Sequence, residues 1–157
     1  MKKIFSILLI IISVFTFSAC HGSKTKKEFV IPESFDESKT YEISFWAKND
    51  TNNVQKAIYN NAISEFERLY PNIKVTIKNY TDYTRIYSDV ITNISTDTTP
   101  NVCITYPDYV ATYLEGNDVV VNLDELIANS KYGLGGNEVK FESVKREELV
   151  EKFIDEC

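Results

Sequence analysis

Three segments of the chain have the hydrophobic pattern of a β-strand. Tyr41–Phe45 and Ile73–Lys78 alternate apolar with polar residues, which predicts strands with one buried face. The two lysines of Ile73–Lys78 favour a position at the edge of a sheet. A third strand is predicted at Asn101–Tyr106, and its continuously apolar middle, Val102–Ile104, favours a central strand covered on both faces.

Helical periodicity separates these strands. Between Val54 and Leu69 the apolar residues recur at +4, +4, +4 and +3, and Pro71 ends the pattern. The segment Tyr83–Ile94 has the clearest helical pattern of the chain, and Asp82 is of a residue type that caps helices. Further predictions are short helices at Tyr109–Glu115 and Leu123–Ile127, a glycine-containing loop at Lys131–Lys140, and a last helix around Leu149–Ile154.

The alternation of strands and helices predicts an α/β fold with a mainly parallel sheet and helices on both faces. We expect the strand order second, first, third, because the second strand has the pattern of an edge strand. Three strands make a small sheet with an apolar edge, so we also expect part of the fold to be missing from this sequence.

The first twenty residues have the layout of a secretory signal peptide. Lys2 and Lys3 precede a 14-residue, mainly apolar run, Ile4–Phe17, which is shorter than the ~20 residues that span a bilayer. We therefore interpret residues 1–19 as a signal peptide that is removed before Cys20. An uncleaved membrane anchor and an ordinary signal peptide with a chance cysteine are the alternatives.

The cleavage region points to lipidation. Phe17–Cys20 resembles the lipobox of bacterial lipoproteins, although leucine is usual where Phe17 stands. The resemblance implies that Cys20 becomes the lipidated first residue of the mature protein, on the outer side of the cell membrane. Residues 20–40 are polar and without sustained periodicity, so we interpret them as the lipidated cysteine and a flexible tether to a domain at 41–157.

Charge restricts the possible partners. The chain has 17 basic and 23 acidic residues, and removal of Lys2 and Lys3 with the leader leaves 15 basic residues and a net charge of −8. This balance argues against nucleic acid as a partner, since phosphate binding requires a basic surface. The cluster Lys24–Lys27 either contacts anionic head groups beside the anchor or is simply solvated.

Catalytic groups are scarce in the predicted domain. The single histidine, His21, lies in the tether, which excludes a Ser-His-Asp or Cys-His arrangement within the domain. Gly133–Gly136 lacks the spacing of a phosphate-binding loop, and no cysteine spacing resembles a zinc site, so we expect no cofactor and no metal. Cys103 reads as a small apolar residue, with a disulfide to Cys157 as the alternative. Carboxylates are plentiful, which leaves a two-carboxylate hydrolase open.

Two loops stand out as a candidate binding site. In open parallel sheets, ligands bind beyond the carboxyl ends of the strands. The loops after the first and third predicted strands each combine an aromatic ring with a carboxylate and polar side chains, a combination that suits sugars. The predicted ligand-binding residues are Trp46, Lys48, Asn49, Asp50, Tyr106 and Asp108. The alternative makes the two aromatic residues core residues, and Asn49 and the two aspartates helix caps.

Several segments, in this order, resemble the extracellular solute-binding proteins of family 1, the maltose-binding-protein-like receptors of ABC importers. They are Ile43–Trp46, Phe66–Val75, Thr99–Val102 and Asn122–Leu126, of which Phe66–Val75 is the most specific. The resemblance covers about residues 41–127. The family usually has aspartate at the position of Asn101, and often a ligand-facing residue at the position of Pro107.

The resemblance implies the first part of one lobe of a periplasmic-binding-protein-like (type II) fold. It implies a lipid-anchored receptor, not an enzyme, that closes on a sugar or oligosaccharide and delivers it to ABC permease subunits in the membrane. Because the sequence stops at Cys157, we expect a truncated receptor that is marginally stable and binds no solute with useful affinity by itself. A surface lipoprotein that acts as an adhesin or interaction module, with a degenerate cleft, is the alternative.

Overall fold

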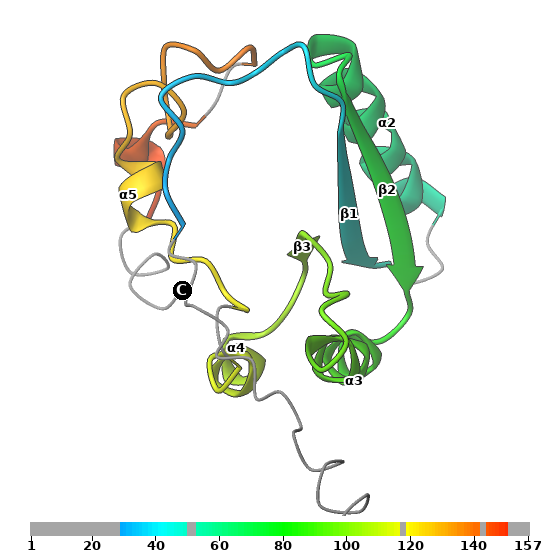
Figure 1. Ribbon diagram of the computed structural model, residues 1–157. Helices are drawn as coiled ribbons and strands as arrows, with labels where there is room; N and C mark the ends of the chain where they lie inside the picture. The colour runs from blue at the N-terminus through cyan, green and yellow to red at the C-terminus, as the bar shows by residue number, and fades with distance from the viewer. Residues whose placement is uncertain (1–28, 50–52, 117–118, 142–143, 151–157) are drawn as a thin grey trace, which may run out of the picture.

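The computed structural model describes residues 29–49, 53–116, 119–141 and 144–150 (Figure 1). The predicted signal peptide, the lipidation site Cys20 and the candidate ligand residue Asp50 lie outside the described residues. The elements are β1 (Tyr41–Lys48), α2 (Asn53–Leu69), β2 (Ile73–Tyr80), α3 (Tyr83–Ile94), β3 (Val102–Cys103), α4 (Pro107–Tyr113), α5 (Asp124–Ile127) and the 3-10 turn η2 (Arg146–Glu148).

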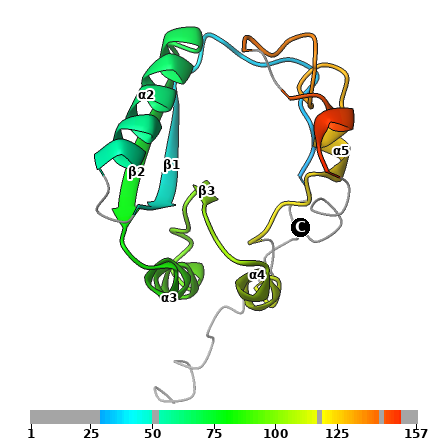
Figure 2. The same cartoon turned by 180° about the vertical axis from the view of Figure 1, so that it is seen from behind.

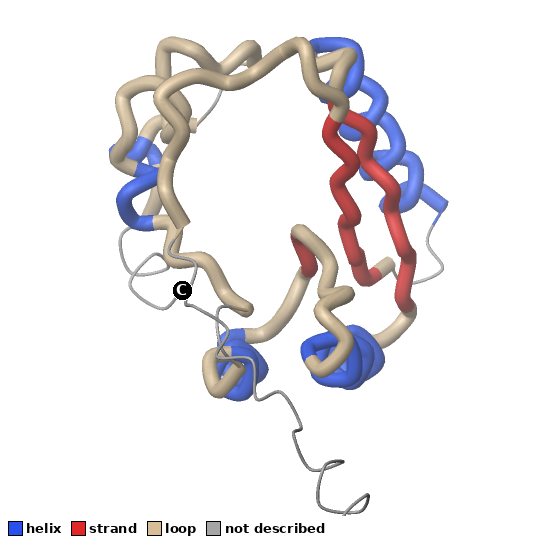
Figure 3. The backbone as a smooth tube through the Cα atoms, in the orientation of Figure 1, coloured by secondary structure: helices blue, strands red, loops and turns tan. Residues whose placement is uncertain are grey.

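The three strands form one parallel sheet with the order β2-β1-β3, as the sequence predicts (Figure 3). The pairing of β1 with β2 runs from Tyr41 opposite Ile73 to Lys48 opposite Tyr80. In contrast, β3 pairs with only the Phe45–Trp46 part of β1. The α/β class with an all-parallel sheet is therefore confirmed.

Helices pack on both faces of this sheet because successive strand residues point to opposite sides. On one face Phe45 meets Tyr59 of α2 edge to face, with ring centroids 5.7 Å apart. On the other face Trp46 joins the hydrophobic core that α3 and α4 complete. Figures 1 and 2 show α2 along one side of the sheet and α3 at the carboxyl end of the strands. The core residues are Trp46, Tyr80, Ile86, Val90 and Tyr113.

The start of α3 follows from its sequence. Asp82 has extended backbone geometry, and its carboxylate accepts the backbone N–H groups of Thr84 at 2.6 Å and Arg85 at 3.2 Å. These contacts satisfy two of the donors that the first helical turn leaves unpaired. The predicted apolar stripe then places Ile86, 1% exposed, and Val90, 3% exposed, against the sheet.

The expectation of a central, fully covered third strand is wrong. The strand β3 has two residues, lies at an edge of the sheet, and leaves Val102 52% exposed. Within the part of the chain that the structure describes, no further strand pairs with its outer side. A continuous apolar run indicates only that both faces of a strand can be covered, and Val102 is left uncovered by the residues that the structure describes.

The segment interpreted as a tether is partly packed. Within residues 29–40, the ring of Phe35 stacks on Tyr41 at 5.1 Å. The ammonium group of Lys131 also donates a hydrogen bond to the backbone carbonyl of Glu33 at 2.9 Å. The described part of this segment therefore connects the sheet to the region after α5 and is not a free tether.

The region after α4 contains little regular structure. It has the short helix α5, the predicted loop over Lys131–Lys140 and the turn η2. Leu149 and Val150, where a last helix was expected to begin, are not helical, and the rest of that prediction falls at residues 151–157, outside the described residues. Among the helices that the structure describes, none is both long enough and apolar enough to cross a membrane.

Candidate functional site: a tyrosine platform at the carboxyl ends of the strands

Three tyrosine rings form a continuous surface beyond the carboxyl ends of the strands. The ring centroids of Tyr83 and Tyr106 are 4.3 Å apart, and Tyr109 meets Tyr106 at 5.8 Å in an edge-to-face arrangement. We call these three residues the tyrosine platform. Tyr106 is 48% exposed, so the platform offers an aromatic surface to solvent.

Local sequence fixes the positions of these rings. Tyr83 is the first residue of α3, and Tyr106 precedes Pro107, the first residue of α4. A proline restricts the residue before it to extended geometry, and Tyr106 accordingly has φ −95° and ψ 150°. Because α3 and α4 are in contact (Figures 1 and 2), the two helix starts bring the rings together.

A second layer of tyrosines supports the platform. Tyr87 of α3 packs on Tyr109 at 4.5 Å and on Tyr113 at 5.9 Å. Tyr113 is 3% exposed, and burial raises the pKa of its phenol, which keeps this supporting ring neutral. The ring of Tyr106 therefore contacts Tyr83 and Tyr109, and Tyr109 is in turn packed on the tyrosine rings of the second layer.

Lys48 brings a positive charge to the same place. Its ammonium nitrogen lies 5.3 Å from the centroid of the Tyr83 ring, within the range of a cation–π interaction. Asp108, in the first turn of α4, is exposed two residues after Tyr106. The N-cap of α4 is Tyr106 and not Asp108, so the structure does not use this carboxylate as the helix cap.

Two other predicted ligand residues lie in the core. Trp46 is 8% exposed and packs on Tyr80 at 5.5 Å, while the ammonium group of Lys78 lies 4.5 Å from its ring. Asn49 is 7% exposed, and its side-chain N–H donates to the amide oxygen of Asn79 at 2.8 Å. The structure thus brings Lys48 and Tyr106 together and places Trp46 and Asn49 beneath the surface.

Sequence reasoning missed Tyr83 and Tyr109. Tyr83 was assigned to the apolar stripe of its helix, and Tyr109 to the start of the next helix. The available signal was the tyrosine spacing: positions 83 and 87 lie one helical turn apart, as do 106, 109 and 113 at successive turns. Such spacing predicts an aromatic row on each helix, but the meeting of the two rows depends on tertiary packing.

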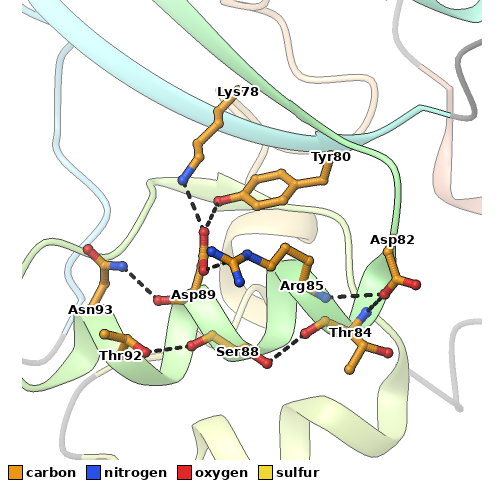
Figure 4. Close-up of polar contacts among 9 residues, drawn as sticks. All are labelled: Lys78, Tyr80, Asp82, Thr84, Arg85, Ser88, Asp89, Thr92 and Asn93. Atoms are coloured by element: carbon orange, nitrogen blue, oxygen red, sulfur yellow. Dashed lines mark hydrogen bonds and ion pairs between the residues drawn. The ribbon is translucent and has the colours of Figure 1, made fainter.

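A charged cluster joins α3 to β2 (Figure 4). One carboxylate oxygen of Asp89 accepts hydrogen bonds from the hydroxyl of Tyr80 at 2.9 Å and from the ammonium group of Lys78 at 3.1 Å. The other oxygen lies 3.3 Å from the side-chain nitrogen Nε of Arg85. The Tyr80 hydroxyl, with Lys78 and Arg85, lowers the pKa of Asp89 below its usual value. A carboxylate held in this way is a poor general base, so we assign the cluster a structural role.

Three other polar side chains of α3 bond to the backbone of the helix itself, as Figure 4 also shows. The hydroxyls of Ser88 and Thr92 donate to the carbonyls one turn earlier, those of Thr84 and Ser88, at 2.9 and 2.8 Å. The Asn93 amide donates likewise to the Asp89 carbonyl at 2.7 Å. These side chains therefore stay close to the helix backbone.

The described residues contain no cluster of metal ligands, and their one cysteine is not set up as a reactive thiol. Across residues 29–49, 53–116, 119–141 and 144–150, no group of three or more His, Cys, Asp or Glu side chains is placed to hold a metal ion. Cys103 is a half-buried free thiol, and burial raises its pKa. A raised pKa keeps the sulfur in the unreactive thiol form at neutral pH.

Comparison of the chain with models of known protein families, with curated proteins and with solved structures found no match in any of the three.

Proposed function

We propose that this chain is the carbohydrate-binding part of a lipid-anchored, extracytoplasmic solute receptor of an ABC importer. The observation that carries this proposal is the exposed ring of Tyr106, supported by Tyr83 at the carboxyl ends of parallel strands. This is the edge of an open parallel sheet at which ligands characteristically bind.

The chemistry of the platform suits a sugar. A pyranose ring has a flat C–H face that packs on an aromatic ring, and hydroxyl groups around its rim that need hydrogen-bond partners. Lys48 and Asp108 supply a donor and an acceptor beside Tyr106, and the tyrosine hydroxyls can both donate and accept. The same combination of groups offers no nucleophile with an adjacent base, so we propose binding without covalent chemistry.

The receptor class has independent support from the sequence. The lipobox-like Phe17–Cys20 supports a lipid anchor, and the segment Phe66–Val75 resembles solute-binding proteins at a helix-to-strand junction. In the structure this junction connects α2 to β2. In such a receptor the ligand stabilises one conformation by its contacts and thereby shifts the population toward it.

Isothermal titration calorimetry of the full chain against maltose, maltotriose, cellobiose and xylobiose tests the proposal. We expect binding of at least one sugar that is weak but saturable, as suits one part of a receptor, and we expect Tyr106→Ala to weaken it by about 30-fold, which corresponds to about 2 kcal/mol for a central aromatic contact. Phe29→Ala is the matched control, because Phe29 is 47% exposed and Tyr106 is 48% exposed. Phe29→Ala should leave the affinity unchanged.

Two results would contradict the proposal: no heat of binding for any of the four sugars, or an equal loss of affinity in both variants. The first result would favour the alternative function, a surface interaction module whose ligand is another protein.

A further inference from the structure

The segment before β1 lies beside a loop that is distant in the sequence. Residues 31–39, which we call the strap, run from the start of β1 toward the loop at residues 131–141 (Figures 1 and 2). The strap is at the end of the sheet where β1 and β2 begin, whereas the tyrosine platform is at the end where the strands finish.

The strap is fixed to the sheet on one side. The ring of Phe35 stacks on Tyr41, the first residue of β1, at 5.1 Å. The Tyr41 hydroxyl donates to the backbone carbonyl of Asp36 at 3.2 Å, and the side-chain amide of Asn72 donates to the carbonyl of Lys39 at 3.0 Å. These contacts make the strap an extension of the sheet.

On its other side the strap is attached to the loop by two lysines. The ammonium group of Lys131 donates to the backbone carbonyl of Glu33 at 2.9 Å, and the ammonium group of Lys140 forms an ion pair with the Glu37 carboxylate at 2.5 Å. We call these two contacts the clasp. Beside them, the backbone N–H of Lys140 donates to the Tyr70 hydroxyl at 2.8 Å.

Apolar packing between strap and loop is incomplete. A cavity of about 410 Å³ lies between them, and its lining includes Phe35 from the strap, Phe66 and Tyr70 from the end of α2, and Val139 and Phe141 from the loop. Side chains that face a cavity lose the contacts that close packing would give. The polar contacts of the clasp therefore carry a large part of the attachment of the loop.

Solvent and dissolved ions reach the clasp. The side chains of Lys140 and Glu37 are 39% and 61% exposed, and that of Lys131 is 47% exposed. Ion pairs of such exposure contribute little stability, and salt weakens them further. The clasp is thus far easier to open than the buried core of Trp46 and Ile86 is to unfold.

We propose that the clasp is releasable, so that ionic strength controls the attachment of the loop at residues 131–141. At low ionic strength the two lysines hold the loop on the strap. At high ionic strength the loop is released, while the sheet, α3 and α4 stay folded. Release opens the cavity between strap and loop and exposes the apolar rings that line it. The inference concerns the end of the sheet opposite the tyrosine platform and does not depend on sugar binding.

Chymotrypsin cleavage of the full chain after Tyr132 and Phe141, followed by mass spectrometry, tests the inference. Glu37→Gln removes the charge that faces Lys140 but leaves the sequence of the loop intact. At low salt it should accelerate both cleavages about 2- to 5-fold, the range expected for loss of one exposed ion pair. A substitution that loosened the strap alone would leave cleavage of the loop unchanged.

Salt provides an arm that needs no substitution. Raising the salt concentration from about 20 mM to about 500 mM should accelerate cleavage of the unsubstituted chain by a similar factor and should affect Glu37→Gln much less. A synthetic peptide with the sequence of the loop corrects for the effect of salt on the protease.

Glu65→Gln is the matched control. The side chain of Glu65 is 59% exposed, against 61% for Glu37, and it pairs with Arg68 within α2, away from the clasp. This variant should leave the cleavage of the loop unchanged. Conversely, Glu37→Lys combined with Lys140→Glu reverses the ion pair and should restore slow cleavage after Tyr132, which is read because Phe141 adjoins the second substitution.

Circular dichroism establishes that the variants are folded, and the salt arm decides the matter should the doubly substituted chain fail to fold. The inference is overturned if salt does not accelerate cleavage of the unsubstituted chain, or if it accelerates Glu37→Gln equally. It is also overturned if Glu37→Gln cleaves no faster than the unsubstituted chain, if Glu65→Gln has the same effect, or if the reversed pair folds but does not restore slow cleavage.

Discussion

Two regions of this chain differ in how they are stabilised. The first, which we call the aromatic core, surrounds the carboxyl ends of the strands, where sheet, α3 and α4 bury a common set of side chains. The second, which we call the outer region, is residues 119–141 and 144–150, and among these described residues the only regular elements are the short α5 and η2. The core residues are 1–8% exposed, whereas the outer region leaves several large apolar side chains in solvent. These are Val120, Val121, Leu123, Phe141, Val144, Leu149 and Val150.

The outer region is held mainly by local hydrogen bonds. The side-chain oxygen of Asn129 accepts the backbone N–H groups of Lys131 and Tyr132, and the N–H of Gly133 donates to the Asn129 carbonyl. Hydrogen bonds of this kind define a backbone path but contribute little net stability in comparison with buried apolar area. The tyrosine platform therefore rests on the part of the molecule that buries the most apolar side-chain surface.

The largest effect should come from the centre of the aromatic core. Ile86 is 1% exposed, so Ile86→Ala removes buried methyl groups and leaves a cavity, which should lower the free energy of unfolding by about 2–5 kcal/mol. Ile58 is 60% exposed on α2, and Ile58→Ala should change this free energy by less than about 1 kcal/mol. Urea unfolding followed by circular dichroism measures both. Equal effects at the two positions would show that the core is not where the structure places it.

A smaller effect is expected from the charged cluster in which Asp89 contacts Lys78, Tyr80 and Arg85. Asp89→Asn keeps the shape of the side chain but removes the charge that faces Lys78 and Arg85, and should lower the free energy of unfolding by about 1 kcal/mol. The control is Glu65→Gln, which removes a charge from an exposed pair with Arg68, whose side chains are 59% and 66% exposed, and it should cause no measurable change. If Asp89→Asn leaves the free energy of unfolding unchanged, the cluster does not stabilise the packing of α3 on β2.

The contribution of Asp89 should also depend on pH. Its pKa in the folded protein is below the ordinary value of 3.8, so the ionised form is the one that folding favours. The stabilisation is therefore present above about pH 4 and is lost as the pH falls through the lowered pKa. The difference in unfolding free energy between the unsubstituted chain and Asp89→Asn, measured from about pH 7 to pH 2, should shrink toward zero at the acid end. A difference that stays constant down to the acid end would exclude an ionic origin.

The smallest effect on global unfolding should come from the outer region. A Cβ atom at Gly133 would collide with the backbone carbonyl oxygens of Leu126, Ile127 and Asn129, so Gly133→Ala must open this turn. Because none of the residues packed in the aromatic core belongs to this turn, the main unfolding transition should move by less than about 0.5 kcal/mol. Limited proteolysis should detect new cleavage near residues 126–137. A large loss of global stability without local cleavage would show that the two regions unfold as one unit.

Much of the fold could be predicted from the sequence, because the aromatic core is built from periodic segments. The bounds of α2 and α3, the cap at Asp82 and the strand order follow from local patterns that agree with the tertiary packing. The strands β1 and β2 run two to three residues beyond their predicted ends, so Trp46 and Lys48, expected in a loop, lie within β1. The position of Val102 could not be predicted, since apolar character does not reveal whether a covering element is present. The contacts of Phe35 with Tyr41 and Tyr70 could not be predicted either, because they depend on the tertiary packing of the amino-terminal segment on the sheet and α2.

The candidate site was predicted only in part. The rule that ligands bind beyond the carboxyl ends of the strands led to Lys48 and Tyr106, which the structure brings to one surface. Trp46 was included because of its chemistry, but strand alternation turns its side chain inward to the core. Tyr83 and Tyr109 were missed because helix periodicity describes one helix at a time, and the platform exists only where α3 and α4 meet.

The central claim is that the tyrosine platform is the surface that contacts sugar. Carbon–proton correlation spectra of the full chain, labelled at its tyrosine rings and titrated with maltotriose and xylobiose, test this most directly. The account predicts saturable shifts of the ring signals of Tyr83, Tyr106 and Tyr109, while those of Tyr41 and Tyr59 stay unchanged. Shifts confined to Tyr41 and Tyr59, or no tyrosine shift with either sugar, would contradict it.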